Sequence, residues 1–305
     1  MDMYFPYLRG RQSELLAIRA LLENDRLSEQ VIPVIEPIKP TPTFRKTLEA
    51  FRDYGRELFI VSNPQVGEFN KEMLGNLEVS EEFRELIDNQ HFKSLTIVAE
   101  REDIRNDSYA YLLKNVDHLE WLKSDEKGNY ASFLFHPDRT EFRRGLRGFR
   151  KRILLADHFQ EETRNADYLK LSSYSFSSDH LYYKDEGYYG FSDYSIVGKR
   201  FMEGGFAPRA VAIHIVYLTK EGNLRIRHFT STSNEDISNP AGKFNEALDK
   251  LVDVFKDDEP NKTLGLEKFL EHHKNGTYPG LGQVKQLSIM HHIELVGSYL
   301  RDDVK

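Results

Sequence analysis

Short apolar runs, each ending on a polar or ionisable residue, recur along this chain and restrict the folds it can adopt. They cover residues 31–36, 58–63, 95–100, 131–136, 153–157, 188–193 and 210–214, and residues 4–9 give an eighth run. Successive run ends lie about 20 to 40 residues apart, enough for a helix and its two loops. Near-continuous apolar runs separated by helical segments are typical of parallel strands buried on both faces. The pattern predicts an α/β protein with a TIM-barrel-like (β/α)8 fold.

Two further patterns follow the last apolar run. Residues 211–218 and 223–230 flank a turn that contains Gly222, which predicts an added β-hairpin. Residues 240–255, 264–273 and 284–300 have the pattern of helices. We therefore expect a (β/α)8-like barrel with its terminal hairpin over residues 1–235 and a C-terminal helical extension packed on it over residues 236–305. The length of 305 residues suits such a barrel with an appendage.

Two segments between the runs need their own interpretation. Residues 103–115, after the run at 95–100, are predicted to be helical. Residues 171–189 are rich in serine and tyrosine and break the rhythm of runs and helices. Loops of that length are usually functional or mobile, so this segment is expected to lie over the site.

Composition and charge limit the classes of protein to which the chain can belong. It has no cysteine, which excludes disulfides and thiolate ligands and agrees with a cytoplasmic location. No run reaches the ~18 apolar residues that a membrane helix needs, and no basic segment typical of a signal peptide precedes the first run. The net charge of −7 repels bulk nucleic acid, so a nucleic-acid role would need a local basic patch.

The polar residues at the run ends are the first candidates for chemistry. In a parallel barrel the carboxyl ends of all strands meet at one mouth, where such proteins place their sites. The run ends are Arg9, Glu36, Asn63, Glu100, His136, Asp157, Asp193 and His214. Carboxylates and imidazoles brought together can bind a divalent metal ion or act as general acid and base.

From this set we expect particular roles. The expected catalytic residues are Glu36, Glu100, His136, Asp193 and His214, and the expected ligands of a divalent metal ion are Glu36, Glu100, Asp157 and Asp193. Each role has a structural alternative, because strand-end residues also cap helices and form ion pairs. His214, inside an apolar strand, could equally be a buried core histidine. Asp157 and His158 are adjacent, so only one of them can point into the mouth.

Glycines and two cations suggest a site for a small anion. Glycine lets backbone amides approach an anion closely, and loops after the last strands of such barrels often hold phosphate. The expected ligand-binding residues are Arg9, Lys199, Gly204 and Gly205. No Walker motif supports this, and a double glycine is also common in a plain turn.

One basic run stands out in the acidic chain. It contains Arg139, Arg143, Arg147 and Arg150, and a helix over residues 138–150 would place the last three on one face. Such a face is either a solvated outer surface or a contact for an acidic partner protein or a nucleic-acid backbone. Few aromatic residues are interleaved with it, which disfavours the nucleic-acid interpretation.

The opening residues resemble those of a known family. Tyr4 to Leu15, followed by Val31 to Glu36, resemble the start of the Beta protein family, a group of bacterial and phage proteins without an established function. Residues 191–194, 204–208 and 240–244 resemble a bacterial branch of it. The resemblance implies a barrel-like fold and a mobile-island setting beside genes of phage-defence type. It implies no catalytic residues.

Two functional hypotheses remain open from the sequence. The first is a metal-assisted enzyme, such as a hydrolase or lyase, that acts on a small phosphorylated or nucleotide-like ligand. The second is a non-catalytic recognition subunit of a two-component defence system, whose protein partner is encoded nearby and contacts the basic run and the helical extension.

Overall fold

The structure is a computed structural model that describes residues 2–105, 108–125, 131–202, 204, 208–258 and 261–301. The chain forms two compact units. The first unit comprises Met1–Leu15, Glu29–Asp157 and Tyr182–Tyr194, and the second comprises Leu16–Ser28, His158–Leu181 and Ser195–Lys305.

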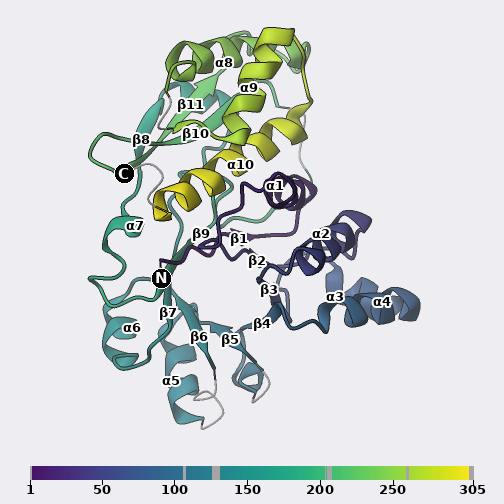
Figure 1. Ribbon diagram of the computed structural model, residues 1–305, viewed down its shortest axis with the longest axis vertical. Coiled ribbons are helices and arrows are strands. Elements are labelled where there is room, and N and C mark those ends of the chain that lie inside the picture. The colour runs from purple at the N-terminus through teal and green to yellow at the C-terminus, as the bar shows by residue number, and fades with distance from the viewer. Residues whose placement is uncertain are drawn as a thin grey trace. The chain divides into compact units, whose positions relative to one another are not determined.

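The first unit contains an eight-stranded parallel sheet that closes into a barrel (Figure 1). Its strands, in spatial order, are β1 (Tyr7–Leu8), β2 (Val34–Ile35), β3 (Leu58–Val61), β4 (Phe92–Ile97), β5 (Ala110–Leu112), β6 (Phe133–His136), β7 (Arg152–Ala156) and β9 (Gly190–Asp193). Tyr4 closes the ring because it pairs in parallel with both Val31 and Phe191. Further backbone hydrogen bonds join Phe5 N to Phe191 O (2.8 Å) and Phe191 N to Met3 O (3.2 Å).

Aromatic side chains fill the interior of the barrel. The rings of Phe5, Phe59 and Phe135 meet edge to face with centroids 5.6 to 5.9 Å apart. Gly190 leaves room for this packing, since a Cβ there would lie 2.7 Å from the Phe5 ring. The barrel is therefore a packed core, and only its ends are accessible to a ligand.

Helices follow most barrel strands, as the sequence predicts. They are α1 (Gln12–Glu23), which begins in the first unit and ends in the second, α2 (Pro42–Asp53), α3 (Phe69–Gly75), α4 (Leu77–Ile87), α5 (Val116–Ser124) and α6 (Thr140–Gly145). Phe44 of α2 stacks on Phe83 of α4 with ring centroids 5.5 Å apart. Leu119 of α5 and Phe142 of α6 pack with Tyr111 and Leu134, whose side chains point to the outer face of the sheet.

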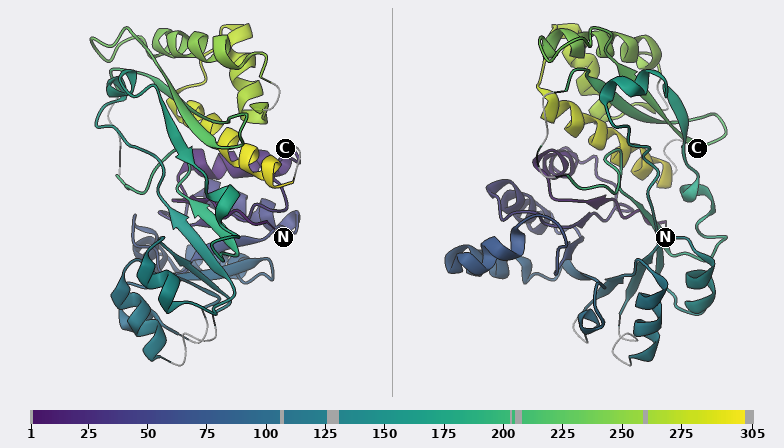
Figure 2. Two further views of the ribbon diagram at one scale, coloured as in Figure 1. Left: turned by 90° about the vertical axis from the view of Figure 1, so that its left-hand side faces the viewer. Right: turned by 180° about the vertical axis from the view of Figure 1, so that it is seen from behind.

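The second unit is a three-stranded antiparallel sheet with helices, seen from two sides in Figure 2. The strands lie in the order β10 (Ala212–Leu218), β11 (Leu224–Thr230) and β8 (Ser173–Ser177). The helices are α8 (Pro240–Phe255), α9 (Leu264–Asn275), α10 (Leu281–Leu300) and the 3-10 helix η3 (Asn165–Leu169), and α7 (Asp179–Tyr182) leads back to the first unit. Phe255 contacts Tyr217 and Phe229 on one face of the sheet.

The predicted fold class is confirmed. The barrel, the added hairpin (β10 and β11) and the three C-terminal helices are all present, and the hairpin belongs to the second unit together with these helices. Among the residues that the structure describes, no helix is long and apolar enough to cross a membrane.

Three local predictions are wrong. The described part of residues 103–115 is not a helix, since Asp103 ends the 3-10 helix η1 (Arg101–Asp103) and residues 110–112 form strand β5. Residues 210–214 do not contribute a strand to the barrel, because β10 pairs antiparallel with β11. The segment 171–189 is not simply a loop, because it contains β8, which pairs with β11. The ring of eight is completed by β5 instead.

Candidate functional site

The alternation of side chains along each strand decides which polar residues face the barrel interior at its carboxyl end. Tyr7, Val34, Val61 and Leu155 belong to the interior core. Residues two positions further along a strand point to the same face. The strands therefore direct Arg9, Glu36, Asn63 and Asp157, four of the eight run ends, toward the mouth.

Glu36 organises the mouth. One of its oxygens, Oε2, accepts a hydrogen bond from the Tyr7 hydroxyl (2.8 Å) and lies 3.3 Å from Arg9 Nε. Its other oxygen, Oε1, accepts from the backbone N–H of Gln65 (2.8 Å). The Glu36 and Arg9 residues are only 3% and 8% exposed. A buried carboxylate with this many donors is a fixed counter-charge that orients the guanidinium of Arg9.

The rings of Tyr7 and Tyr194 both lie beside the Arg9 guanidinium. The Arg9 guanidinium carbon lies 5.9 Å from the centroid of the Tyr7 ring and 5.5 Å from that of Tyr194. Burial is the main reason that the pKa of Tyr194 is raised, while Arg9 lowers it and the charges of Glu36 and Asp157 raise it further. Both phenols are therefore protonated at neutral pH, since burial and Glu36 also raise the pKa of Tyr7. The sequence reasoning missed Tyr194 because the preceding residue, Asp193, was taken as the run end.

The loop after β1 holds Arg9 in place. Gly10 has a positive φ of 61°, and a Cβ there would lie 3.3 Å from Glu36 O. Glu14 at the start of α1 accepts hydrogen bonds from the backbone N–H groups of Arg9 (3.1 Å) and Arg11 (2.9 Å). The loop is a tight turn that needs glycine and a buried carboxylate, so the backbone of Arg9 is fixed.

Asn63 and Glu100 make hydrogen bonds that hold the backbone at the strand ends. The Asn63 side chain donates to Ile97 O and accepts from Ile97 N (both 2.8 Å), which links the ends of β3 and β4. Glu100 is exposed, and its backbone N–H donates to Asp103 (2.8 Å) at the start of η1. The structure thus brings Asn63 to the rim of the mouth and leaves Glu100 at the start of an exposed turn.

Asp193 and His136 point to the outer face of the sheet, because their chain neighbours Tyr194 and Phe135 belong to the interior core. Asp193 accepts a hydrogen bond from the buried Tyr4 hydroxyl (2.7 Å). The His136 ring stacks on Phe142 of α6 at 5.0 Å, and burial lowers the pKa of His136 to about 4. The structure brings neither of them together with Arg9 and Glu36.

The remaining predicted residues belong to the second unit or lie outside the described chain. His214 is on β10, and Lys199 and Gly204 are also in the second unit. Gly205 lies outside the described residues. His214 is therefore not at the end of a barrel strand, contrary to the sequence-based expectation.

The expected metal ligands do not form one coordination group. Both Glu36 oxygens have donors, Glu100 is exposed, and Asp193 is bonded to Tyr4. Of the expected set, Asp157 alone remains exposed at the mouth. Within the described ranges no group of three or more histidine or acidic side chains is placed to hold a metal ion.

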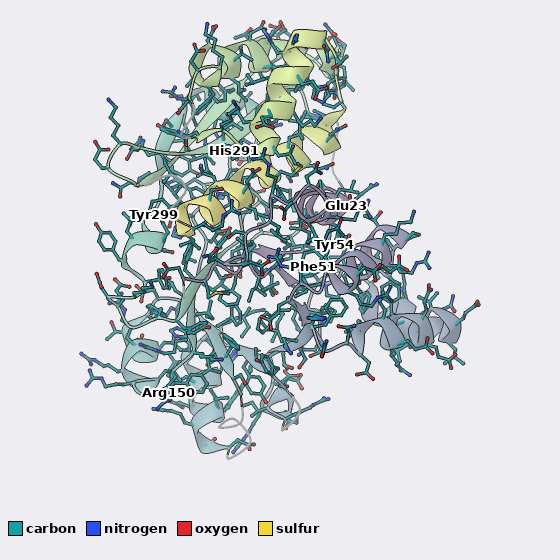
Figure 3. The ribbon with its side chains drawn as sticks, in the orientation of Figure 1. Glu23, Phe51, Tyr54, Arg150, His291 and Tyr299 are labelled. Atoms are coloured by element: carbon teal, nitrogen blue, oxygen red, sulfur yellow. The ribbon has the colours of Figure 1, made fainter. Side chains whose placement is uncertain are left out.

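The basic run is exposed but less helical than predicted. Helix α6 ends at Gly145, so Arg147 and Arg150 follow it and do not share a helix face with Arg143. Arg143 pairs with Asp138. Arg150, labelled in Figure 3, is exposed, as are Arg139 and Arg147.

Comparison with known proteins adds no family to these observations. No protein-family model matches the chain, and no curated protein matches it significantly.

Proposed function

We propose that the barrel is an enzyme that binds a small phosphorylated or nucleotide-like ligand at its mouth, with Arg9 as the anion-binding group. The observation that supports this most strongly is the Arg9 guanidinium, buried beside two tyrosine rings and oriented by Glu36. A guanidinium has five N–H donors in a fixed fork that suits phosphate, and its contact with Glu36 is through Nε.

Two further groups would act on the bound anion. Tyr194, protonated because its pKa is raised, can donate a hydrogen bond or a proton. Asp157 is exposed and close enough to influence Tyr194, so it is the carboxylate that would serve as a general base. A divalent cation remains part of the proposal only as a companion of the ligand phosphates, with Asp157 as its protein carboxylate.

Binding of inorganic pyrophosphate and of ATP, measured calorimetrically with and without Mg²⁺, tests the anion site. We expect Arg9→Met to weaken binding by about tenfold or more and Arg9→Lys to restore part of it. Arg101→Met, which removes an exposed arginine of the same unit, is the matched control and should change nothing. Unchanged affinity in a folded Arg9→Met protein would refute the assignment.

Turnover separates an enzyme from a receptor. Hydrolysis of ATP followed by phosphorus NMR should be lost in Asp157→Asn while ATP binding is retained. An equal rate in Asp157→Asn and wild type would remove Asp157 from the mechanism.

The alternative proposal is a non-catalytic recognition subunit of a defence pair. The exposed Arg139, Arg147 and Arg150 favour it. Reversal of these three to glutamate should abolish co-purification with a neighbouring gene product, and retained co-purification would exclude this surface. Membership of the Beta protein family and a cytoplasmic location are proposals of the same kind, and they rest on the opening residues and on the absence of cysteine.

A further inference from the structure

A cavity of about 290 Å³ lies entirely within the second unit. Its walls come from β10, from the first two turns of α10 and from the segment that leads into η3. Ile196, Val197, Leu281 and Val284 supply apolar side chains to it. The volume is that of a small metabolite. The lining residues do not include Arg9, Tyr7, Glu36, Asp157 or Tyr194 of the barrel mouth.

A pair of histidines shapes one wall. His214, which lines the cavity, and His228 are directly opposite each other on β10 and β11, and their Nδ1 atoms are 2.6 Å apart. Two nitrogens at that distance share one proton, so one ring donates and the other accepts. The Tyr168 ring packs against both, with centroids 4.7 Å and 4.5 Å away. His214 is therefore held in place, and Nε2 is its remaining nitrogen for a ligand.

The lining carries positive and negative charges on different segments. On the side of β10 and α10 lie His214, the Lys285 ammonium and the buried Ser288 hydroxyl. Burial lowers the pKa of His214, and His228 and the nearby Lys285 lower it further. On the segment before η3 lie the carboxylates of Glu161 and Glu162. Donors and a cation on one side and two anions on another suit a ligand that carries both charges.

We propose that this cavity binds a zwitterion of the amino-acid class with an apolar side chain. The carboxylate of the ligand would meet Lys285, Ser288 and the Nε2–H of His214, and its ammonium group would meet Glu161 and Glu162. The apolar side chain would contact Leu281 and Val284. His214 can donate from Nε2 because His228 can supply the shared Nδ1 proton. The inference is independent of the function proposed for the barrel.

The test uses the full chain and calorimetric titration with the common L-amino acids, with L-leucine as the reference probe. Isoamylamine and 4-methylpentanoate, which lack the carboxylate and the amine respectively, are the single-charge analogues. L-leucine should bind at least about tenfold more tightly than either analogue, since each loses its charge-assisted hydrogen bonds. Glu162→Gln and Lys285→Met should each weaken L-leucine binding by about tenfold.

Controls distinguish this site from the barrel mouth and from misfolding. Glu271→Gln removes an exposed carboxylate of α9 and should leave L-leucine binding unchanged, as should Arg9→Met. Circular dichroism should report the same fold for each variant. The proposal is overturned if no L-amino acid binds, or if isoamylamine binds as tightly as L-leucine. It is also overturned if folded Glu162→Gln and Lys285→Met both retain wild-type affinity.

Discussion

Two buried carboxylates of the barrel have tyrosine hydroxyls as partners but serve opposite faces of the sheet. Glu36 accepts from Tyr7 beside the Arg9 guanidinium, whereas Asp193 accepts from Tyr4 where the ring of strands closes. The same chemical pair therefore orients a binding group in one place and joins β9 to the amino-terminal segment in the other.

Removal of the Tyr4 hydroxyl should weaken the barrel without altering its mouth. A hydrogen bond to a charged group contributes about 2 kcal/mol, so Tyr4→Phe should lower the free energy of unfolding by about that amount. Urea unfolding followed by circular dichroism measures the loss, and pyrophosphate affinity should not change. Tyr54→Phe, at a tyrosine that is 56% exposed and labelled in Figure 3, is the control. Equal stability of the two variants would show that the bond to Asp193 contributes nothing.

Much of the candidate site follows from the sequence once alternation is applied to every run. Arg9, Glu36 and Asp157 each lie two residues after a core side chain, and all three are predicted site residues. Asp193 is grouped with them in the prediction because it is the last residue of its run. Gln65 could not have been predicted, since its contact with Glu36 is through a backbone N–H.

Strand β9 depends on a glycine at the point where the barrel closes. A Cβ at Gly190 would lie 2.7 Å from the Phe5 ring and 2.8 Å from Met3 O. The ring of Phe5 is fixed by other aromatic side chains of the core, so it cannot move aside cheaply.

Gly190→Ala should therefore destabilise the barrel by about 1–3 kcal/mol, the usual cost of overpacking a core. Gly75 at the end of α3 is the matched control, because no atom lies within 4 Å of a Cβ there. Gly75→Ala should be neutral or slightly stabilising in the same urea titration. A Gly190→Ala protein as stable as Gly75→Ala would show that the closing segment can shift.

Strand β5 shows why one element escaped prediction. It has three residues, and Tyr109 and Leu113 extend its apolar run to five residues before Lys114. The hydroxyl of Tyr111 accepts a hydrogen bond from Arg105 N (2.7 Å), so a side chain of the strand also holds the backbone of Arg105. A run this short fits either a strand or a helix, and only pairing with β4 and β6 decides it.

Buried ionisable groups make the stability of the whole protein depend on pH in two opposing ways. Burial lowers the pKa values of His136, His228 and His291 (the last labelled in Figure 3) from 6.5 to about 4. In the unfolded protein these histidines bind more protons than in the folded protein between pH 4 and 6.5. Each therefore contributes about 3 kcal/mol to the free energy of unfolding, which is present above pH 6.5 and lost as the pH falls toward 4.

Glu294 on α10 acts in the other direction. Burial raises its pKa from 4.5 to about 7, and it accepts a hydrogen bond from Leu264 N (2.7 Å) at the start of α9. The folded protein therefore binds the extra proton between these values, and the contribution of Glu294 to the free energy of unfolding falls as the pH rises through this interval. These three histidines outweigh Glu294 between about pH 4 and 6.5, so the net stability still rises with pH over that range.

The stability of the wild type should thus rise between about pH 4 and 6.5 and level off near pH 7, because the opposing contribution of Glu294 reduces the rise without reversing it. Glu294→Gln keeps an acceptor for Leu264 N and removes the charge, so its stability should rise more steeply over this range than that of the wild type. Urea unfolding at a series of pH values, with amide hydrogen exchange in α9 and α10, measures both profiles. Glu271→Gln, at an exposed carboxylate of α9, should keep the wild-type profile. If the stability of Glu294→Gln rises no more steeply than that of the wild type, the ionisation of Glu294 does not oppose folding, and the histidine contribution must then be tested alone through His291→Gln.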